Sequence, residues 1–344
     1  MTQATIYSVP LVGPATPTAM AQRIDDNFDA IISGHSGSSR PSYAVAGTQW
    51  QDTSVAGTVK YYHYDGSNDR LLMTVNTSTG KIAFGDGSDE AYRGHLVGLT
   101  LSNNLSDASN DIDIAAGSSA SDGTTPALMT LASAITKRLD AAWAVGTGNG
   151  GRMSAAAIAD GTYHVWEIGR SDTGVVDVGF DVSATAPTMP ANYDRKRRIG
   201  SIMRVSGSIV PFIQTGDIFA RAVRIQDVFA TNPGTSAVTR TLSVPTGIGV
   251  FPFGTIQIEI TTASAITVSC LLTDLAQPDS DPATVGGHVT FTTLTAGGSQ
   301  RGFSYFGNIK TNTSAQLRSR FNNSGPATNF FLHTDGWVDT RGRT

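Results

Sequence analysis

The chain has little cysteine and little charge. Among its 344 residues there is one cysteine, Cys270, so no disulfide can form within one chain. Charged residues make up 15% of the composition, below the roughly 25% of a typical soluble domain. We therefore predict that stability comes from packing or assembly. Cys270 lies inside the apolar run 266–272, which predicts a buried, small hydrophobic side chain.

Long apolar runs and an export signal are also missing. No stretch approaches 18 uninterrupted apolar residues, so the sequence predicts no membrane insertion. The N-terminus has no basic region followed by an apolar core, so we expect no signal peptide and synthesis in a cytoplasm. The net charge of −4 provides no basic field for phosphates, which argues against a nucleic-acid partner.

Sequence patterns of catalytic and metal sites are scarce. The six histidines show no metal-ligand spacing, and there is no Gly-x-Ser-x-Gly elbow. The acidic segments 85–90 and 107–113 lack the glycine and final glutamate of an EF-hand loop, so we interpret both as solvated turns. We predict that the protein is not an enzyme, and we assign it no catalytic residues, no cofactor and no metal ligands.

Two groups of charged residues need an interpretation. Glu167, Asp177 and Asp181 lie on expected strands, and two of them are compatible with one shared face. Alternating acids are ordinary on an exposed sheet face, so we interpret them as surface residues and not as a glycosidase pair. The basic run 195–198 is expected to form an exposed turn or an intersubunit salt-bridge patch.

Glycine is abundant in the sequence, and the apolar residues occur in short runs. The chain has 37 glycines and 40% hydrophobic residues, too many hydrophobic residues for a disordered protein. Short apolar runs separated by turn residues are typical of β-proteins. We predict a mainly β fold with a short N-terminal arm and helix, followed by β-sandwich- or jelly-roll-like modules in an oligomeric fibre.

One helix is predicted, over 18–33, after a proline-containing arm over 1–16. Its apolar residues recur at helical spacing and form one stripe, made of Met20, Ile24, Phe28 and Ile31, with Ile32 beside it. A helix of about four turns is marginal alone. The stripe therefore needs a partner, which is either other copies of the chain, a docking surface or the chain's own fold.

Four parts are expected along the chain. They are an N-terminal arm and helix for attachment and oligomerisation (1–40), a small β unit (41–95), a central β module (96–225) and a C-terminal β-sandwich (226–344). In the central module, strands are predicted over 163–168 and 175–182, and a short helix within 126–139.

The C-terminal part shows the clearest strand pattern. Seven strands are predicted, over 236–244, 254–261, 265–272, 288–294, 302–309, 314–321 and 329–338. This number and spacing favour a sandwich or jelly roll. The last strand runs almost to the C-terminus, which suggests an end buried against its own module or another copy. We expect most of the aromatic residues here to lie in the core, although together they are also compatible with a sugar-stacking surface.

Three segments carry a resemblance to a known class of protein. The first is the ending 336–342, with the pattern Gly-Trp-x-Asp-x-Arg-Gly. The second is 47–54, with a Trp-x-Asp-Thr-Ser sequence that follows the helix and a His-Ser-Gly linker. The third is 188–202, with Pro-x-x-Tyr, basic residues and Arg-Ile-Gly-Ser-Ile. In these segments the chain resembles bacteriophage tail-fibre and head-fibre proteins.

The resemblance implies a virion protein that forms a homotrimer. Its N-terminus would attach to other virion proteins, and its C-terminal module would bind the host surface, including a cell-surface glycan, through many weak contacts. The candidate surface-binding residues are Trp337, His333 and Tyr305. Two alternatives stay open: a protein that decorates the capsid or tail without a receptor role, and a tail-associated polysaccharide depolymerase.

Overall fold

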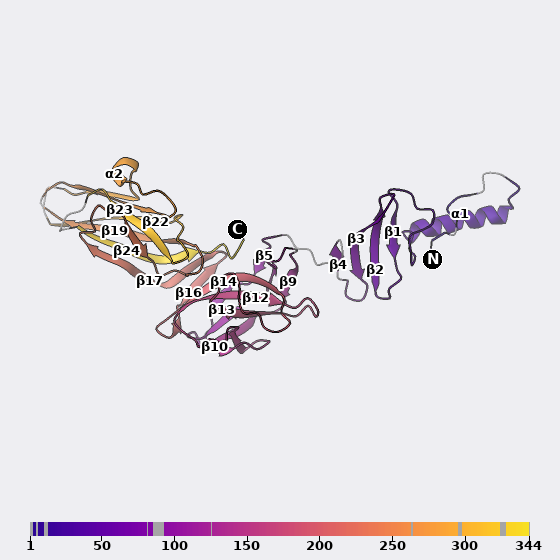
Figure 1. Cartoon of the computed structure of the whole chain (residues 1–344), viewed down its shortest axis with the longest axis horizontal. Helices are drawn as coiled ribbons and strands as arrows, with labels where there is room; N and C mark the ends of the chain where they lie inside the picture. Colours follow the sequence, from indigo (N-terminus) through magenta and orange to yellow (C-terminus); the bar gives the residue numbers. More distant parts are fainter. Residues whose placement is uncertain are drawn as a thin grey trace. The chain divides into compact units, whose positions relative to one another are not determined.

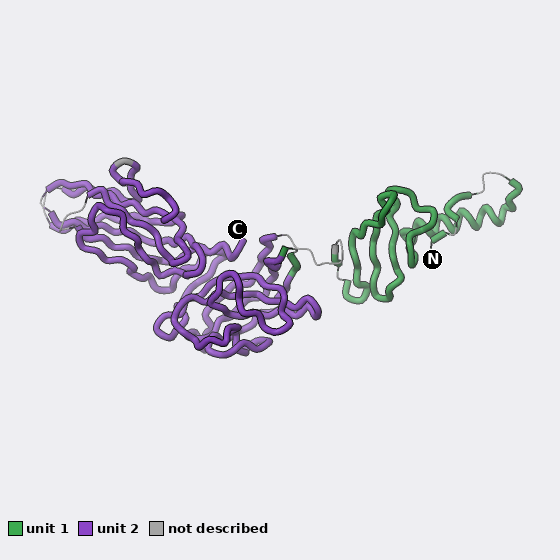
Figure 2. Tube along the Cα trace, viewed as in Figure 1, with its two compact units in different colours: residues 1–92, 124–128 green, residues 93–123, 129–344 purple. Residues whose placement is uncertain are grey.

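The computed structural model describes residues 3–4, 6–9, 13–80, 82–84, 93–124, 126–262, 264–294, 298–323 and 328–343. The protein is mainly β, with 47% strand and 6% helix, as predicted (Figure 1). It divides into two compact units (Figure 2). Unit 1 comprises 1–92 and 124–128, and unit 2 comprises 93–123 and 129–344. Within the described ranges, no helix is long and apolar enough to cross a membrane.

Unit 1 begins with the predicted helix, α1 (Pro17–Ile32). Thr16 caps its N-terminus, because the Thr16 hydroxyl accepts a hydrogen bond from the Ala19 N–H at 3.2 Å. Pro17 occupies the first turn, where its missing N–H costs nothing. After the helix, Gly34 adopts a φ of +62°, which ends the helical path.

The rest of unit 1 is an antiparallel sheet of consecutive strands. These are β1 (Gln49–Asp52), β2 (Thr58–Tyr64), β3 (Asp69–Asn76) and β4 (Ile82–Phe84). Trp50 connects neighbouring strands of this sheet. It is 5% exposed, stacks on Tyr62 at 4.9 Å and donates its Nε1–H to Asp69 at 3.0 Å. Asp69 also pairs with Arg40 at 3.1 Å, so one carboxylate connects the linker after α1 to the sheet.

Unit 2 contains one hydrogen-bonded sheet of 13 strands, in the order β15-β14-β12-β13-β11-β10-β7-β6-β16-β17-β24-β19-β22. Its first nine members are β15 (Ser208–Ile209), β14 (Arg195–Val205), β12 (Gly161–Gly169), β13 (Val176–Asp181), β11 (Asn149–Arg152), β10 (Ile135–Ala142), β7 (Asp111–Ile114), β6 (Leu101–Asn103) and β16 (Phe212–Thr215). A smaller sheet has the order β5 (Leu96–Gly98), β8 (Gly117–Ala120) and β9 (Leu128–Leu131).

The C-terminal half of unit 2 is a two-layer sandwich. One layer is β17 (Ile218–Thr231), β24 (Thr328–Val338), β19 (Phe251–Thr261) and β22 (Ser299–Phe306), and the other is β18 (Val238–Thr241), β23 (Gln316–Phe321), β20 (Thr267–Thr273) and β21 (Val289–Thr292). The short helix α2 (Pro282–Val285) follows β20. All seven strands predicted for this half are present, and Figure 1 labels β19, β22, β23 and β24 among them.

The sandwich core is apolar. Ile256, Ile258 and Phe330 from one layer share a buried cluster with Leu317 and Phe321 from the other, and the rings of Phe321 and Phe330 meet edge to face at 5.0 Å. Cys270 is fully buried in the same cluster, which confirms its prediction as a small core side chain.

β17 joins the two halves of unit 2. It pairs with β16 of the first half and with β24 of the sandwich. The expected boundary between 225 and 226 falls inside this strand, and the division of the chain into four parts stays a prediction.

Two local predictions for the first half are wrong. The segment 126–139 forms no helix: β9 and the start of β10 lie there, because its apolar residues alternate in and out in two short strands separated by a bend. The basic run 195–198 is not an exposed turn but the beginning of β14, and Arg197 and Arg198 are 6% and 8% exposed.

The segment that follows β24 packs against its own unit, with Asp339 and Arg341 buried. After β24, Asp339 accepts two hydrogen bonds from the Arg198 guanidinium, at 2.6 and 2.8 Å. Arg341 donates to the carbonyl oxygens of Ile199 and Leu99 at 2.6 and 2.7 Å. The final segment therefore connects β24 to β14 and to the loop before β6, as an end tied into its own module requires.

Candidate functional site

The sheet β17-β24-β19-β22 has one buried and one outer face. Along β19, Ile256, Ile258 and Ile260 are fully buried in the sandwich, while Thr255 and Gln257 point to the other side. Side chains of a strand alternate between faces, and residues directly opposite on neighbouring strands share a face. The strand register therefore identifies every residue of the outer face.

This register brings aromatic side chains together on the outer face. In one row, Phe229 lies opposite Phe331, and Gln257 lies between Phe331 and Phe303. In the next row, Thr255 lies between His333 and Tyr305. We call this surface the aromatic face; its members are Phe229, Phe303, Tyr305, Phe331 and His333.

The aromatic face is exposed to solvent, and some of its rings lie against one another. Phe229, Phe303 and Tyr305 are 57%, 66% and 82% exposed, and Phe331 and His333 are half-buried. The rings of Phe229 and Phe331 lie 5.0 Å apart, and Phe331 stacks on His333 at 6.4 Å. Clustered exposed apolar side chains on one face mark an interaction surface.

Charged pairs lie beside the aromatic rows. Arg224 pairs with Asp335 at 2.5 Å, and Arg301 pairs with Glu259 at 3.2 Å. The face thus combines flat rings, which stack on apolar ring faces, with polar groups that form hydrogen bonds at the rim. Such a surface is chemically suited to the apolar face of a sugar ring or to a second protein surface.

Two of the three predicted binding residues belong to this face. Tyr305 and His333 both lie opposite Thr255, one strand away on either side, which places them about 10 Å apart. Phe229 was not predicted as a contact residue, because β17 does not alternate regularly between buried and exposed positions and gives no periodic signal.

The third predicted binding residue, Trp337, does not lie on the aromatic face. It is 1% exposed and stacks on Phe219 at 5.5 Å, so it is a core residue and not a surface contact. Up to Thr334 the even-numbered residues of β24 point inward, but a register shift at Asp335 reverses the phase. A bulge of this kind moves the residues after it to the other face. Trp337 therefore enters the core although His333, four residues earlier, points outward.

In unit 1, the apolar stripe of α1 is uncovered. Met20 and Ile24 are 39% and 42% exposed, Phe28 and Ile31 are 58% and 52% exposed, and Ile32 is 74% exposed. The spacing predicted for these residues is the one observed. Within the described part of unit 1, the helix buries only Ala30.

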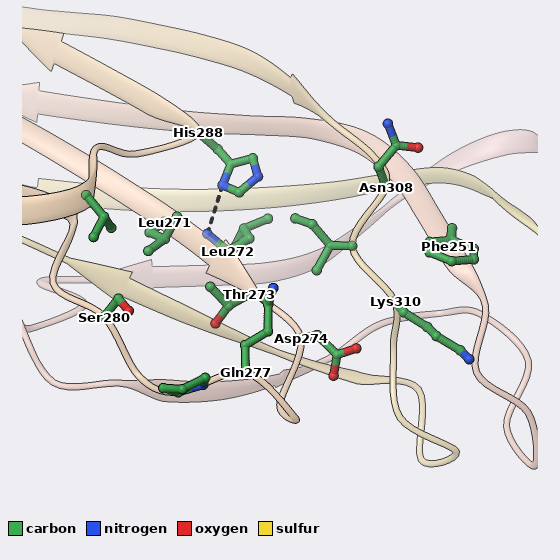
Figure 3. Close-up of a pocket in the computed structure, with 13 residues that line it drawn as sticks. Phe251, Leu271, Leu272, Thr273, Asp274, Gln277, Ser280, His288, Asn308 and Lys310 are labelled. Carbon is green, nitrogen blue, oxygen red and sulfur yellow. Dashed lines mark hydrogen bonds between the residues drawn. The ribbon is translucent and has the colours of Figure 1, made fainter.

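A hollow of about 650 Å³ opens at one end of the sandwich (Figure 3). His288 borders it, but its Nδ1 already accepts a hydrogen bond from the Leu272 N–H at 3.2 Å, and burial lowers its pKa. In Figure 3 the Lys310 side chain extends away from His288. The basic groups of this hollow do not converge on one point.

The three strand acids are buried, not exposed as predicted. Glu167 is fully buried, accepts a hydrogen bond from the Ser119 hydroxyl, and has a pKa raised to about 8 by desolvation. Asp177 pairs with buried Lys137 at 3.0 Å. Asp177 and Asp181, four residues apart on β13, share one face, as the expectation for two of the three acids allowed. Glu167 lies opposite Val178 and Asp177 opposite Ile168, so Glu167 is on the other face from Asp177. Glu167 and Asp177 therefore do not form the opposed pair that glycoside hydrolysis requires.

A serine, a histidine and an aspartate also meet inside unit 2. His164 Nδ1 lies 2.9 Å from the Ser201 hydroxyl, which contacts Asp339 at 3.4 Å. The serine lies between the other two residues, unlike a hydrolase triad, where the histidine is central. His164 is fully buried, and desolvation lowers its pKa to about 4. This cluster is a structural network.

The segment 107–113 was expected to be a solvated turn, but only 107–110 form a turn, since 111–113 begin β7 and Ile112 is fully buried. The Asp107 carboxylate is already occupied within this turn. Its Oδ1 accepts hydrogen bonds from the N–H groups of Ser109 and Asn110, both at 3.1 Å. The other acidic segment, 85–90, lies outside the described residues.

Comparisons with known proteins give little to build on. No family model and no curated protein matches the chain. Among solved structures it is similar to the "Crystal Structure of A. japonicus CB05", at 10% identity over 83% of this chain and 67% of that one, with a TM-score of 0.18. It is also similar to a glycoside hydrolase family 43 arabinoxylan arabinofuranohydrolase from Bacillus subtilis, at 11% identity over 85% and 66%, with a TM-score of 0.15. At these scores neither likeness carries an argument.

Proposed function

We propose that the chain is a bacteriophage virion appendage protein, a tail fibre or head fibre, that assembles as a homotrimer. Its N-terminal helix attaches to itself and to other virion proteins, and its C-terminal sandwich binds a glycan on the host surface. The observation that carries the proposal is that two uncovered apolar surfaces exist, the stripe of α1 in unit 1 and the aromatic face in unit 2. They add to the resemblance of three sequence segments to this class.

The helix stripe supports self-association. Phe28 and Ile32 face water in the single chain. Burying a large apolar side chain stabilises a protein by about 1.5–3 kcal/mol, so covering these two side chains favours association. Packing three stripes together removes all of them from water at once. The trimer number itself comes from the resemblance.

Native mass tests the assembly. Three chains of 36.0 kDa give 108 kDa, which light scattering behind a sizing column distinguishes from a monomer. Phe28→Asp is expected to dissociate the trimer, whereas Gln22→Glu, which adds the same charge on another side of α1, leaves it intact. A monomer at high protein concentration contradicts the trimeric fibre.

The aromatic face supports glycan binding, because aromatic rings stack on sugar rings and the neighbouring charged groups bond hydroxyls. The test uses labelled protein on a panel of bacterial surface polysaccharides. We expect binding that Phe303→Ala and Tyr305→Ala abolish and that Leu105→Ala, a fully exposed control, leaves unchanged.

Point variants are preferable here to removing residues 226–344. That deletion takes away β24 and Asp339, which hold β17 and β14 in place, and so disrupts the rest of unit 2. Virions whose aromatic-face variants adsorb normally favour the decorating protein without a receptor role. New reducing ends after incubation with polysaccharide favour the depolymerase.

A further inference from the structure

A third uncovered apolar surface lies on the sheet of unit 1. One row of opposed residues contains Tyr61 and Met73, and the next row contains Val59, Val75 and Ile82. Residues directly opposite on neighbouring strands share a face, and so do residues two apart along one strand. Both rows therefore lie on the same side of the sheet. We call this surface the unit 1 face, and these five residues are its members.

The sequence of the strands prepares this face for burial. The intervening residues Lys60 and Thr74 lie opposite one another on the other side of the sheet. An antiparallel sheet with apolar side chains on one side and polar ones on the other is the kind that packs its apolar side against a core. The alternation along β2 and β3 therefore specifies a covered face.

The single chain does not cover the unit 1 face. Ile82 is 48% exposed, and the other four members are half-buried. All seven residues of β2, an inner strand of the sheet, are half-buried as well. Among the described residues α1 makes no extensive contact with these strands, and Figure 1 shows it extending beyond the β1 edge of the sheet. A small sheet in water needs one packed face to be stable.

Unit 1 also lacks a core of its own. Within the described ranges, both clusters of buried apolar side chains lie in unit 2. The buried residues described in unit 1 are Ala4, Ala30, Pro41, Trp50 and Ala127, of which only Trp50 is large. Small domains are marginally stable even with a complete core. Unit 1 therefore needs apolar surface that comes from outside the unit.

A second copy of the chain is the partner that this face fits best. Its five members carry no charge, so the face offers no charge pattern for a different partner to complement. Interfaces between identical subunits that fold together are apolar and resemble a domain core cut in half. The single subunits of such proteins often have no stable fold. A copy of the same chain is also present wherever the chain is made, which is not true of an unrelated partner.

We propose that the unit 1 face packs against unit 1 of a second copy of the chain, so that the core of this unit forms between copies. The polar side of the sheet, with Lys60 and Thr74, stays in water. This inference goes beyond the self-association assigned to the α1 stripe, because it concerns a different surface of unit 1.

Thiol labelling tests whether the face is covered. Val59→Cys and Lys60→Cys place a thiol at adjacent, half-buried positions of β2 on opposite sides of the sheet. Cys270 is fully buried, so it does not compete for the reagent. In the full chain, we expect a maleimide to modify Val59→Cys at least about tenfold more slowly than Lys60→Cys, because reaction at a covered site requires transient opening.

The labelling rates are interpreted together with the native mass. Slow labelling of Val59→Cys in an oligomer supports the proposal. Equal labelling of the two variants overturns it. Slow labelling in a protein with the mass of one chain, 36.0 kDa, also overturns it, because the chain then covers the face by itself.

A charge on the face tests the contact between copies. Val75→Asp is expected to raise the dissociation constant of the oligomer at least roughly tenfold, because burying an unpaired carboxylate is unfavourable. Light scattering over a dilution series measures this constant. Assembly of Val75→Asp as tight as that of the unaltered protein overturns the proposal. The labelling test remains decisive if Val75→Asp does not fold, since it introduces no charge.

Asn76→Asp is the matched control. It adds the same charge at the next residue, which is exposed. The Asn76 side-chain oxygen accepts hydrogen bonds from the N–H groups of Ser78 and Thr79, which a carboxylate also accepts. This variant should assemble like the unaltered protein.

This inference and the proposed function fail in different ways. If Phe28→Asp dissociates the oligomer while Val59→Cys is labelled as fast as Lys60→Cys, the α1 stripe joins the copies and the unit 1 face does not. If Phe28→Asp leaves the native mass unchanged while Val59→Cys is protected, the contact between sheets stands and the role of the stripe fails.

Discussion

The two halves of unit 2 differ in the residues that fill their interiors. Around β12 and β14 the buried residues include His164, Glu167 and Arg198, and Lys137 is buried beside Asp177. In the sandwich, among the residues described between 238 and 338, the buried polar side chains are serines and threonines only. One interior is held by charge pairs and the other by apolar contact.

The difference has consequences for function. Removing one partner of a buried ion pair strongly destabilises the folded state, because the other charge is left buried without a partner. The titratable groups buried in the first half are expected to make its stability depend on pH, and Nε and Nη2 of buried Arg197 have no hydrogen-bond partner among the described residues. The sandwich keeps its charges outside, for example in the Arg301–Glu259 pair, next to the aromatic face. Its outer surface can therefore change with little effect on its core.

The largest expected effect comes from the charged half. Asp339→Asn removes the carboxylate that pairs with buried Arg198, and we expect a loss of about 3–5 kcal/mol in the free energy of unfolding, measured with urea. Asp335→Asn, which breaks the exposed pair with Arg224, is the control and should cost about 0–1 kcal/mol. Equal losses in both variants contradict the special role of the buried pair.

A cavity in the sandwich is expected to cost nearly as much for a different reason. Leu317→Ala empties a fully buried position, and a loss of about 2–5 kcal/mol should follow. The loss should be the same at pH 5 and pH 8, because among the residues described between 238 and 338 no carboxyl, imidazole or amino side chain is buried, and burial raises the pKa of the Cys270 thiol above its usual value. Leu294→Ala, at a position that is 70% exposed, should have little effect. A strong pH dependence of the Leu317→Ala loss argues against a purely apolar interior.

The pH dependence of stability is expected to report on the buried titratable groups in the first half of unit 2. Folded Glu167 keeps its proton up to a pKa of about 8, whereas the unfolded chain releases it near 4.5. The folded state therefore binds more protons in this window, and stability falls as pH rises. His164, with a pKa lowered from 6.5 to about 4, acts in the opposite direction at acidic pH. The decline should therefore be clearest from about pH 6.5 to 8.

Glu167→Gln tests this directly. Urea unfolding at pH 6.5 and 8 should show a smaller decline in the variant than in the unaltered protein, since the titrating group is gone. Glu259→Gln alters a carboxylate on the outer face of the sandwich sheet that is paired with Arg301; it serves as control and should retain the decline. If the Glu167→Gln protein loses stability over this range just as the unaltered protein does, another group is responsible.

The smallest effect on stability is expected at the aromatic face. Tyr305 is 82% exposed, so Tyr305→Ala should change the free energy of unfolding by less than about 0.5 kcal/mol. Phe330→Ala, two strands away on the inner face, should cost about 3–5 kcal/mol. A thermal melt of both variants checks the contrast. A large loss in Tyr305→Ala indicates that this side chain is structural.

Sequence reasoning worked where the signal is local. The spacing of Met20, Ile24 and Phe28 was enough to predict α1, and short apolar runs separated by turn residues were enough to predict the seven sandwich strands. It was not enough for Trp337, because a single bulge at Asp335 changes which face a residue occupies. The segment 126–139 was ambiguous in a similar way, since two short strands with a bend between them imitate helical spacing.

The sequence by itself determined the mainly β class, the apolar stripe of α1 and the core position of Cys270. Only the tertiary structure decided the roles of the charged residues. Arg197 and Arg198 are adjacent and chemically identical, yet Arg198 pairs with Asp339, whereas Nε and Nη2 of Arg197 have no hydrogen-bond partner among the residues that the structure describes. The partner that distinguishes them, Asp339, lies 141 residues from Arg198 along the chain. Pairing at that separation depends on which strands meet in space, and no local pattern encodes it.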